Sequence, residues 1–207
     1  MNRIHRERRV FIAVPLLYLA GGWAAIQAQA LLDHRVGDTA TGLSKLGQVS
    51  GLVKYKGNDL YRWVLPNHNS LRAAVDAKGA VVYLESSWGH KSDETGCDLA
   101  GLKFGATTLA DLRKRFGSNG FAFKKRPHMT NTDDGVMLLN SWETGNVVVT
   151  FYTRIGPADY AKARTSGESD AGPDAKLEAI SLANPGYAKS EWGDRVYDPA
   201  YKKIEWK

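Results

Sequence analysis

The sequence predicts an α+β fold built from two tandem repeats, each a helix followed by an antiparallel sheet. The main observation is a motif that occurs twice, over residues 35–52 and 103–121. In each copy, glycines flank an amphipathic stretch. Strand-like segments joined by turn residues follow both copies. Such regular recurrence is typical of a duplicated supersecondary unit. The matching positions are Val36-Gly37 with Phe104-Gly105, Leu46-Gly47 with Phe116-Gly117, and Gly51-Leu52 with Gly120-Phe121.

The N-terminus has the three parts of a secretory signal peptide. Residues 2–9 are basic, residues 10–26 are almost wholly apolar, and Ala28-Gln29-Ala30 fits a small-residue cleavage site. We therefore expect residues 1–30 to be a signal peptide, cleaved after Ala30. The alternative is an uncleaved anchor over residues 10–32, which would hold the chain to the inner membrane facing the periplasm. Both interpretations export the remainder, as a periplasmic or secreted protein.

Composition narrows the classes of function. The chain has 207 residues, 43% of them hydrophobic, which is enough for a folded core. Four arginines and one glutamate in residues 1–30 supply +3 of the +6 net charge, so the remainder is too weakly basic to indicate a nucleic-acid partner. Cys97 is the single cysteine, which excludes an intrachain disulfide. We interpret it as a small core residue.

The first repeat is expected over residues 31–100. Its helix spans residues 39–46 and is weakened by Gly42 in its interior. Three strands follow, over residues 61–65, 71–76 and 81–86. Ala77-Lys78-Gly79 supplies a tight turn between the last two strands, so these form a hairpin.

The second repeat is expected over residues 101–183, followed by a tail over residues 184–207. Thr107 or Thr108 caps its helix, and Leu109, Leu112 and Phe116 form one apolar stripe that packs on a sheet. Residues 156–175 are rich in small and polar residues and predict an irregular excursion between strands. The strands are expected over residues 121–123, 136–142, 147–155 and 176–182, with a hairpin turn at 143–146.

This arrangement resembles the β-lactamase inhibitor proteins and the small lipoproteins of the outer-membrane assembly machinery. The likeness is carried by Phe104-Gly105-Ala106-Thr107, by the stripe that ends at Phe116-Gly117, and by the degenerate copy from Val36 to Gly47. It implies a fold and the capture of another protein by an aromatic-lined sheet face. The chain departs from both families, because those inhibitors carry a disulfide in each unit and those lipoproteins carry a lipidated cysteine where Leu31 stands here.

Alternation along the strands predicts which side chains point away from the helices. Val149 and Phe151 suit the core, which turns Tyr152 and Arg154 outward. Tyrosine, tryptophan and arginine dominate binding hot spots because they bury a large area with little loss of freedom. The candidate partner-binding residues are Trp63, Arg72, Tyr83, Glu85, Trp142, Tyr152 and Arg154, with the facing of the two tryptophans left open.

Other chemistry is less well supported by the residues. His90, Asp93 and Cys97 share one connector, but a zinc site needs four closely spaced ligands. Asp133-Asp134 could act as paired carboxylates, although Asp-Asp-Gly is typical of a turn. Lys124-Lys125-Arg126 is interpreted as a solvated strand end. We therefore expect no cofactor, no metal site and no catalytic residues.

The sequence thus favours an exported protein-binding module, possible roles being those of an inhibitor or immunity protein that acts through its sheet face. The expected partner is another envelope or secreted protein, and membrane contact is expected only through residues 10–32 if these stay uncleaved. One alternative is a membrane-anchored envelope assembly or scaffold component. The other is a secreted hydrolase that uses Cys97 or Asp133 and Asp134.

Overall fold

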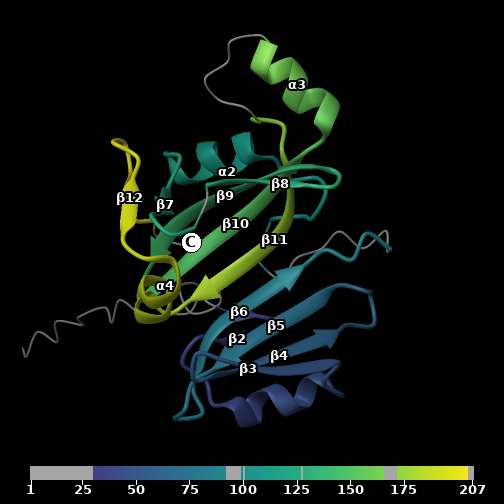
Figure 1. Cartoon of the computed structure of the whole chain (residues 1–207), viewed down its shortest axis with the longest axis vertical. Coiled ribbons are helices and arrows are strands. Elements are labelled where there is room, and N and C mark those ends of the chain that lie inside the picture. Colours follow the sequence, from purple (N-terminus) through teal and green to yellow (C-terminus); the bar gives the residue numbers. More distant parts are fainter. Residues whose placement is uncertain (1–29, 92–98, 100, 127, 166–171, 205–207) are drawn as a thin grey trace, which may run out of the picture.

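The computed structural model describes residues 30–91, 99, 101–126, 128–165 and 172–204. In this part of the chain, one large antiparallel sheet runs in the order β12-β7-β9-β10-β11-β6-β5-β4-β3, with β8 paired to β9 beside this path (Figure 1). The predicted fold class of two helix-plus-sheet repeats is therefore wrong. The two expected sheets are one because β6 and β11 pair, from Ser87↔Ala179 to Tyr83↔Ala183. That pairing satisfies backbone groups that would otherwise lie along two open edges.

The strands of the large sheet come from both halves of the sequence. The first half supplies β3 (Gly51–Tyr55), β4 (Asn58–Val64), β5 (Ser70–Val75) and β6 (Val81–Ser87). The second half supplies β7 (Phe121–Phe123), β8 (Met129–Thr132), β9 (Gly135–Thr144), β10 (Val147–Ile155), β11 (Lys176–Ala183) and β12 (Arg195–Tyr197). A separate two-stranded ribbon is formed by β1 (Ala30–Leu31) and β2 (His34–Arg35).

The two predicted helices differ in type and in how their N-termini are capped. The first is the 3-10 helix η1 (Ala40–Leu46), which has no side-chain cap hydrogen bond and contains Gly42. The second is the α-helix α2 (Leu109–Phe116), whose predicted cap is confirmed. Thr108 Oγ1 accepts from the backbone N–H of Asp111 at 3.1 Å, and Asp111 Oδ2 accepts from that of Thr108 at 2.9 Å. This capping box satisfies two N–H groups that the first helical turn leaves free.

Two further helices were not expected. The segment over residues 156–175 was predicted to be irregular, yet α3 (Pro157–Thr165) forms within it. The tail contains α4 (Pro185–Trp192), where Asn184 Oδ1 accepts from the N–H of Gly186 and proline occupies the first helical turn. Proline at that position removes only an N–H that would lack a helical partner in any case. No helix among the described residues is long and apolar enough to cross a membrane.

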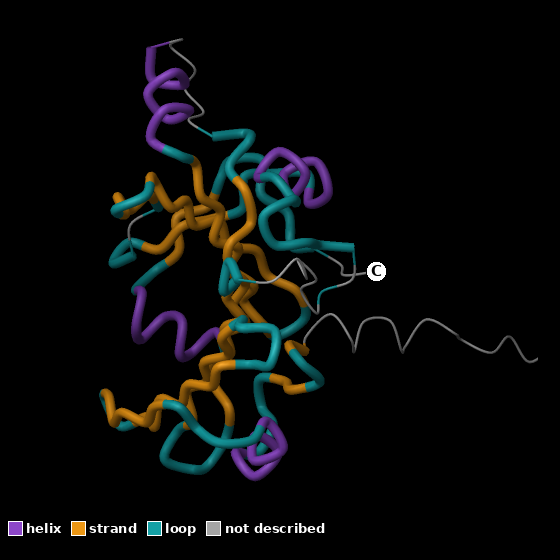
Figure 2. Tube along the Cα trace, turned by 90° about the vertical axis from the view of Figure 1, so that its right-hand side faces the viewer, coloured by secondary structure: helices purple, strands orange, loops and turns teal. Residues whose placement is uncertain are grey.

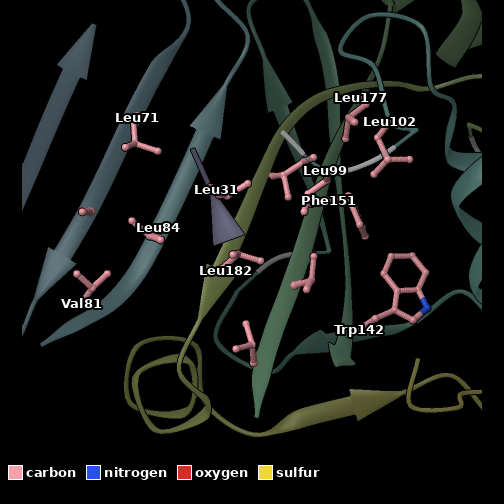
Figure 3. Packing of buried hydrophobic residues seen from close by; sticks show 14 of the residues in the cluster. Leu31, Leu71, Val81, Leu84, Leu99, Leu102, Trp142, Phe151, Leu177 and Leu182 are labelled. Atoms are coloured by element: carbon pink, nitrogen blue, oxygen red, sulfur yellow. The ribbon is translucent and has the colours of Figure 1, made fainter. Parts of the chain in front are cut away.

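The main core lies on one face of the sheet, which we call the core face. Leu43 of η1 and Leu112 of α2 belong to the same cluster of buried side chains, so both helices cover this face. Leu71, Leu84, Phe151, Leu177 and Leu182 reach it from strands of both halves (Figure 3). Strands of both halves therefore share one continuous core.

The opposite face, which we call the outer face, is covered over only part of its width. Helix α4 lies on the other side of the strands from η1 and α2 (Figure 2). Its Ala188 packs with Phe121, Phe123, Val148 and Ala183. The covered region is the outer face of β9, β10 and β11. The bare region is the outer face of β3, β4 and the Arg72 end of β5, whereas Ala74 of β5 is buried. The candidate site lies where these two regions meet.

Candidate functional site

One register row crosses the outer face and places polar side chains from successive strands in line. Alternation dictates this face, because every second residue of a strand points to the same side. The row runs through consecutive strand partners: Gly51, Arg62, Arg72, Glu85, Ser181, Thr150 and Ser141. Arg62 and Arg72 are exposed, whereas Ser181, Thr150 and Ser141 are buried. The row therefore changes from exposed to buried between β5 and β11.

Glu85 stands at that change and binds three side chains. Its Oε1 lies 3.3 Å from Arg72 Nη1 and accepts from the hydroxyl of Ser87, also at 3.3 Å. Its Oε2 accepts from the phenol of Tyr83 at 2.5 Å. The carboxylate is buried, with 8% of the residue exposed, so these donors replace the water that it has lost.

Two tyrosines and an arginine extend this network across β11 and β10. The phenol oxygen of Tyr152 lies 3.3 Å from that of Tyr83 and 3.3 Å from Ser181 Oγ, and it accepts from Arg126 Nη2. The guanidinium of Arg126 lies 4.0 Å from the ring centroid of Trp192, on α4. Burial and the charge of Glu85 hold the pKa of both phenols above its usual value, so both favour the protonated form that can donate a hydrogen bond. We call Arg72, Tyr83, Glu85, Arg126, Tyr152 and Ser181 the outer cluster.

A second polar group lies farther along the same face. The register of β10 with β11 passes from Tyr152↔Ala179 to Thr153↔Leu177, so Glu178 is an extra, bulged residue. The bulge points Glu178 to the outer face. There its Oε1 accepts from Arg154 Nε and Nη2 at 3.0 and 2.9 Å. Its Oε2 lies 2.7 Å from His90 Nε2.

His90 reaches this position through a tight bend. The N–H of Gly89 donates to Asn69 Oδ1 at 2.9 Å. A Cβ at Gly89 would lie 2.0 Å from the carbonyl oxygen of His68, so a larger residue cannot take its place without moving the backbone. The ring of His90 packs on Trp88, with the centroids 4.1 Å apart. The bend, the stacking and Glu178 together fix the imidazole at the edge of the bare region.

The structure separates the seven predicted partner-binding residues into three sets. Arg72, Tyr83, Glu85 and Tyr152 belong to the outer cluster, and Arg154 belongs to the group around Glu178. Trp63 and Trp142 lie on the core face, 2% and 0% exposed, which corrects their assignment as binding residues. Both alternate with outer-face neighbours such as Arg62 and Ser141, so their register turns them inward.

Several contributors, among them Glu178, Arg126 and Trp192, were not predicted as binding residues. Glu178 was missed because a bulge interrupts the alternation that identifies outward residues. Arg126 was interpreted as part of a solvated basic triplet, yet its side chain is half-buried between Tyr152 and Trp192. Its neighbours Phe121 and Phe123 were the available signal, since both are buried against α4. No sequence signal indicated the role of Trp192, because the tail alternates aromatic and charged residues without a clear period.

The hydrolase alternative receives no assembled site within the described residues. Cys97 and Asp93 lie outside them. Asp133 and Asp134 form the turn between β8 and β9, and Asp134 contacts Thr132 and Arg154. The Thr132 hydroxyl and then the charge of Arg154 lower the pKa of Asp134, which suits an ion-pair partner rather than a general acid. In the same described ranges, no three histidine, cysteine or acidic residues are grouped to hold a metal ion.

Two hollows lie near the covered region. One of about 10 Å³ is lined by Phe123, Arg126, Ser141 and Thr150, among others, which shows how closely the segment after β7 covers the sheet. The other, of about 340 Å³, is lined by residues that include Arg113 and Asp198. None of the seven predicted binding residues lines either hollow. Neither of these two hollows is therefore part of the candidate site, although Arg126 of the outer cluster borders the smaller one.

Comparisons with known proteins add little to this description. No protein-family model and no curated protein matches the chain. One similar solved structure is an extracellular protein containing an SCP domain from Bacillus anthracis, with 10% identity and a TM-score of 0.41. The match covers 96% of this chain and 56% of that one, so this chain spans little more than half of its length.

A second similar structure is a DUF4309 family protein from Bacillus subtilis, with 13% identity and a TM-score of 0.39. That match covers 71% of this chain and 78% of the other. Neither structure is a β-lactamase inhibitor protein or an assembly lipoprotein. At these scores, the likeness carries no argument about what this chain does.

Proposed function

We propose that this chain is an exported protein-binding module that recognises another envelope or secreted protein through the outer face of its sheet, as an inhibitor or immunity protein does. The observation that carries the proposal is a fixed, hydrogen-bonded cluster beside a bare sheet face. Val53 and Val64 are 63% and 57% exposed in the bare region, and the side chain of Arg72 is 53% exposed. Apolar side chains beside an arginine are typical of the centre of protein interfaces.

Within this surface, residues divide into those that touch a partner and those that position them. Arg72 and Arg62 are open to a partner, whereas Glu85 and Tyr152 are buried and Tyr83 is half-buried. The buried residues hold the guanidinium of Arg72 in place through Glu85. A preorganised arginine loses less conformational freedom on binding than a free one, which favours affinity.

Export is supported by the signal-like N-terminus, residues 1–29 of which lie outside the described structure. Leu31 is fully buried in the main core. A chain cleaved after Ala30 keeps that leucine and therefore its core contacts. An anchor over residues 10–32 cannot include Leu31 within a bilayer, so the alternative of an anchored scaffold component requires a membrane segment that ends before it.

The binding proposal is tested by affinity capture from envelope and culture fractions, with quantitative mass spectrometry. Combined Arg62→Ala and Arg72→Ala substitutions should lower the recovery of the specific partner by at least about tenfold, as expected for removal of hot-spot arginines. Arg35→Ala is the matched control, because Arg35 is an exposed arginine of β2, which belongs to the separate two-stranded ribbon and not to the outer face of the large sheet. Equal recovery with the double variant and the control would show that the outer face is not the binding surface.

Processing is tested separately by N-terminal sequencing of the protein recovered from cells that express the full chain. A first residue of Leu31 supports removal of the signal peptide. A protein that retains residues before Ala30 and pellets with membranes supports the anchored alternative.

A further inference from the structure

Among the described residues, the large sheet has three edge strands: β12, β3 and the short strand β8, where Tyr160 of α3 contacts Met129. The edge strand β12 has three residues and is followed by Asp198 and Pro199, and proline cannot donate to a further strand. At the opposite end of the strand order, β3 has five residues and pairs only with β4 within the described part of the chain. Leu52, Val53 and Tyr55 of β3 are 56%, 63% and 47% exposed. Such an edge can accept a further strand.

The turn after β3 determines which backbone groups point to that open edge. Lys56 and Gly57 form a two-residue turn, both with positive φ (48° and 81°), and Tyr55 is the register partner of Asn58. In such a hairpin, the residues that flank the turn exchange both backbone hydrogen bonds. Gly51, Val53 and Tyr55 therefore bond to β4. The N–H and C=O groups of Leu52 and Lys54 point outward.

We propose that a second copy of this chain pairs with β3 in antiparallel orientation, with the two-fold axis at Val53. Leu52 of each copy then lies opposite Lys54 of the other. Both residues present outward backbone groups, so the two strands form four hydrogen bonds. On the outer face, Val53 meets Val53, and each Tyr55 covers the Gly51 of the other copy.

This register is the one that the side chains favour. A shift that moves the axis to Lys54 brings two lysines directly opposite each other, which is unfavourable. A shift that moves the axis to Leu52 leaves Tyr55 beyond the paired segment. With the axis at Val53, all five residues of β3 pair, the lysine stem lies along Leu52, and an aromatic ring fills the space beside a glycine. Lys54 also stays near Asp59 of its own chain, 3.5 Å away, so its charge has a partner.

The pairing would join the bare regions of the two copies into one surface. Side chains that point to the outer face in one copy meet outer-face side chains in the other, because the pleat continues across the new strand pair. A contact based on one strand is small, so the dimer should be weak and dependent on concentration. The inference does not depend on the proposed function.

The test uses the protein recovered from cells that express the full chain. Sedimentation velocity between about 1 and 500 µM should show a monomer–dimer equilibrium, the range that suits a small interface. Val53→Lys places two lysines on the axis and should weaken the dimer at least about tenfold. Val196→Lys makes the same change on the exposed β12 edge and should leave the dimer unchanged.

Amide hydrogen exchange identifies the strand and its register. Exchange at Leu52 and Lys54 should slow by at least about tenfold from the lowest to the highest concentration, while Val53 stays equally protected. Leu52→Pro removes an outward N–H and should also abolish the dimer, with an unchanged circular dichroism spectrum as the check on folding. A monomer at every concentration, a dimer that Val53→Lys does not weaken, or a dimer without new protection at Leu52 and Lys54 would overturn the inference.

Discussion

The covered and bare regions of the outer face are built from strands with the same alternation, yet their side chains differ in how far they are buried. Thr150 and Ser181 lie under α4 and the segment after β7, where both are buried. Arg62 and Arg72 continue the same register row but stay exposed, because nothing among the described residues packs over them. The comparison teaches that alternation determines which way a side chain points, whereas later segments determine whether it is buried.

The largest expected change in stability comes from introducing one charge into each region. Val148→Asp buries an unpaired carboxylate under α4, where Val148 is 0% exposed, and should lower the free energy of unfolding by about 3–5 kcal/mol. Val53→Asp makes the same change in the bare region and should stay within about 0.5 kcal/mol. Urea unfolding measures both values. Equal effects would show that the two regions are not differently covered in solution.

A second test concerns the boundary between the regions. Glu85→Ala leaves the phenol of Tyr83 without its acceptor and should lower the free energy of unfolding by about 2–3 kcal/mol, since hydrogen bonds to charged groups are strong when buried. Arg72→Ala removes a half-exposed partner of the same carboxylate and should cost less than about 1 kcal/mol. If Arg72→Ala costs as much as Glu85→Ala, the cluster depends on the ion pair rather than on the hydrogen bond from Tyr83.

A third test uses alkaline pH, to which the covered region should respond. Burial, and then the charge of Glu191, raises the pKa of Tyr187 from 10.0 to about 12. The folded state therefore retains a proton that the unfolded state loses, so stability is complete below pH 10 and falls as the pH rises toward 12. The loss attributable to this phenol should be on the order of 1 kcal/mol. Unfolding at about pH 9 and pH 11 measures the slope, and Tyr187→Phe should reduce it; an unchanged slope would contradict the assignment.

The smallest effect is expected in the bare region and has the opposite sign. Arg62 lies directly across from Arg72, and like charges in that position repel each other. Arg62→Glu should therefore raise the free energy of unfolding by about 0.2–1 kcal/mol. Arg62→Gln serves as the control for loss of charge alone. A decrease in stability with Arg62→Glu would show that another group already neutralises the pair.

The sequence allowed some of this face to be predicted and not the rest, for identifiable physical reasons. Tyr152 and Glu85 were placed outward correctly, because period-two alternation depends only on neighbouring residues. Glu178 escaped that rule because a bulge adds a residue to β11. Alternation also could not predict the pairing of β6 with β11, since no local pattern specifies which distant strand will lie alongside. The facing of Trp63 and Trp142 follows from register rather than from residue type.

The pairing of β6 with β11 also affects how the chain can reach this fold. Strands β3 to β6 form hairpins between sequence neighbours, but residues 83–87 of β6 lack their β11 partner until residues 179–183 have been made. Contacts between segments so far apart in sequence form slowly, and an unpaired strand promotes association with other chains in the meantime. A chain kept unfolded until synthesis is complete would bring β6 and β11 together without that exposed interval. The proposed export, if it takes the chain through a membrane in an extended state, would provide this delay.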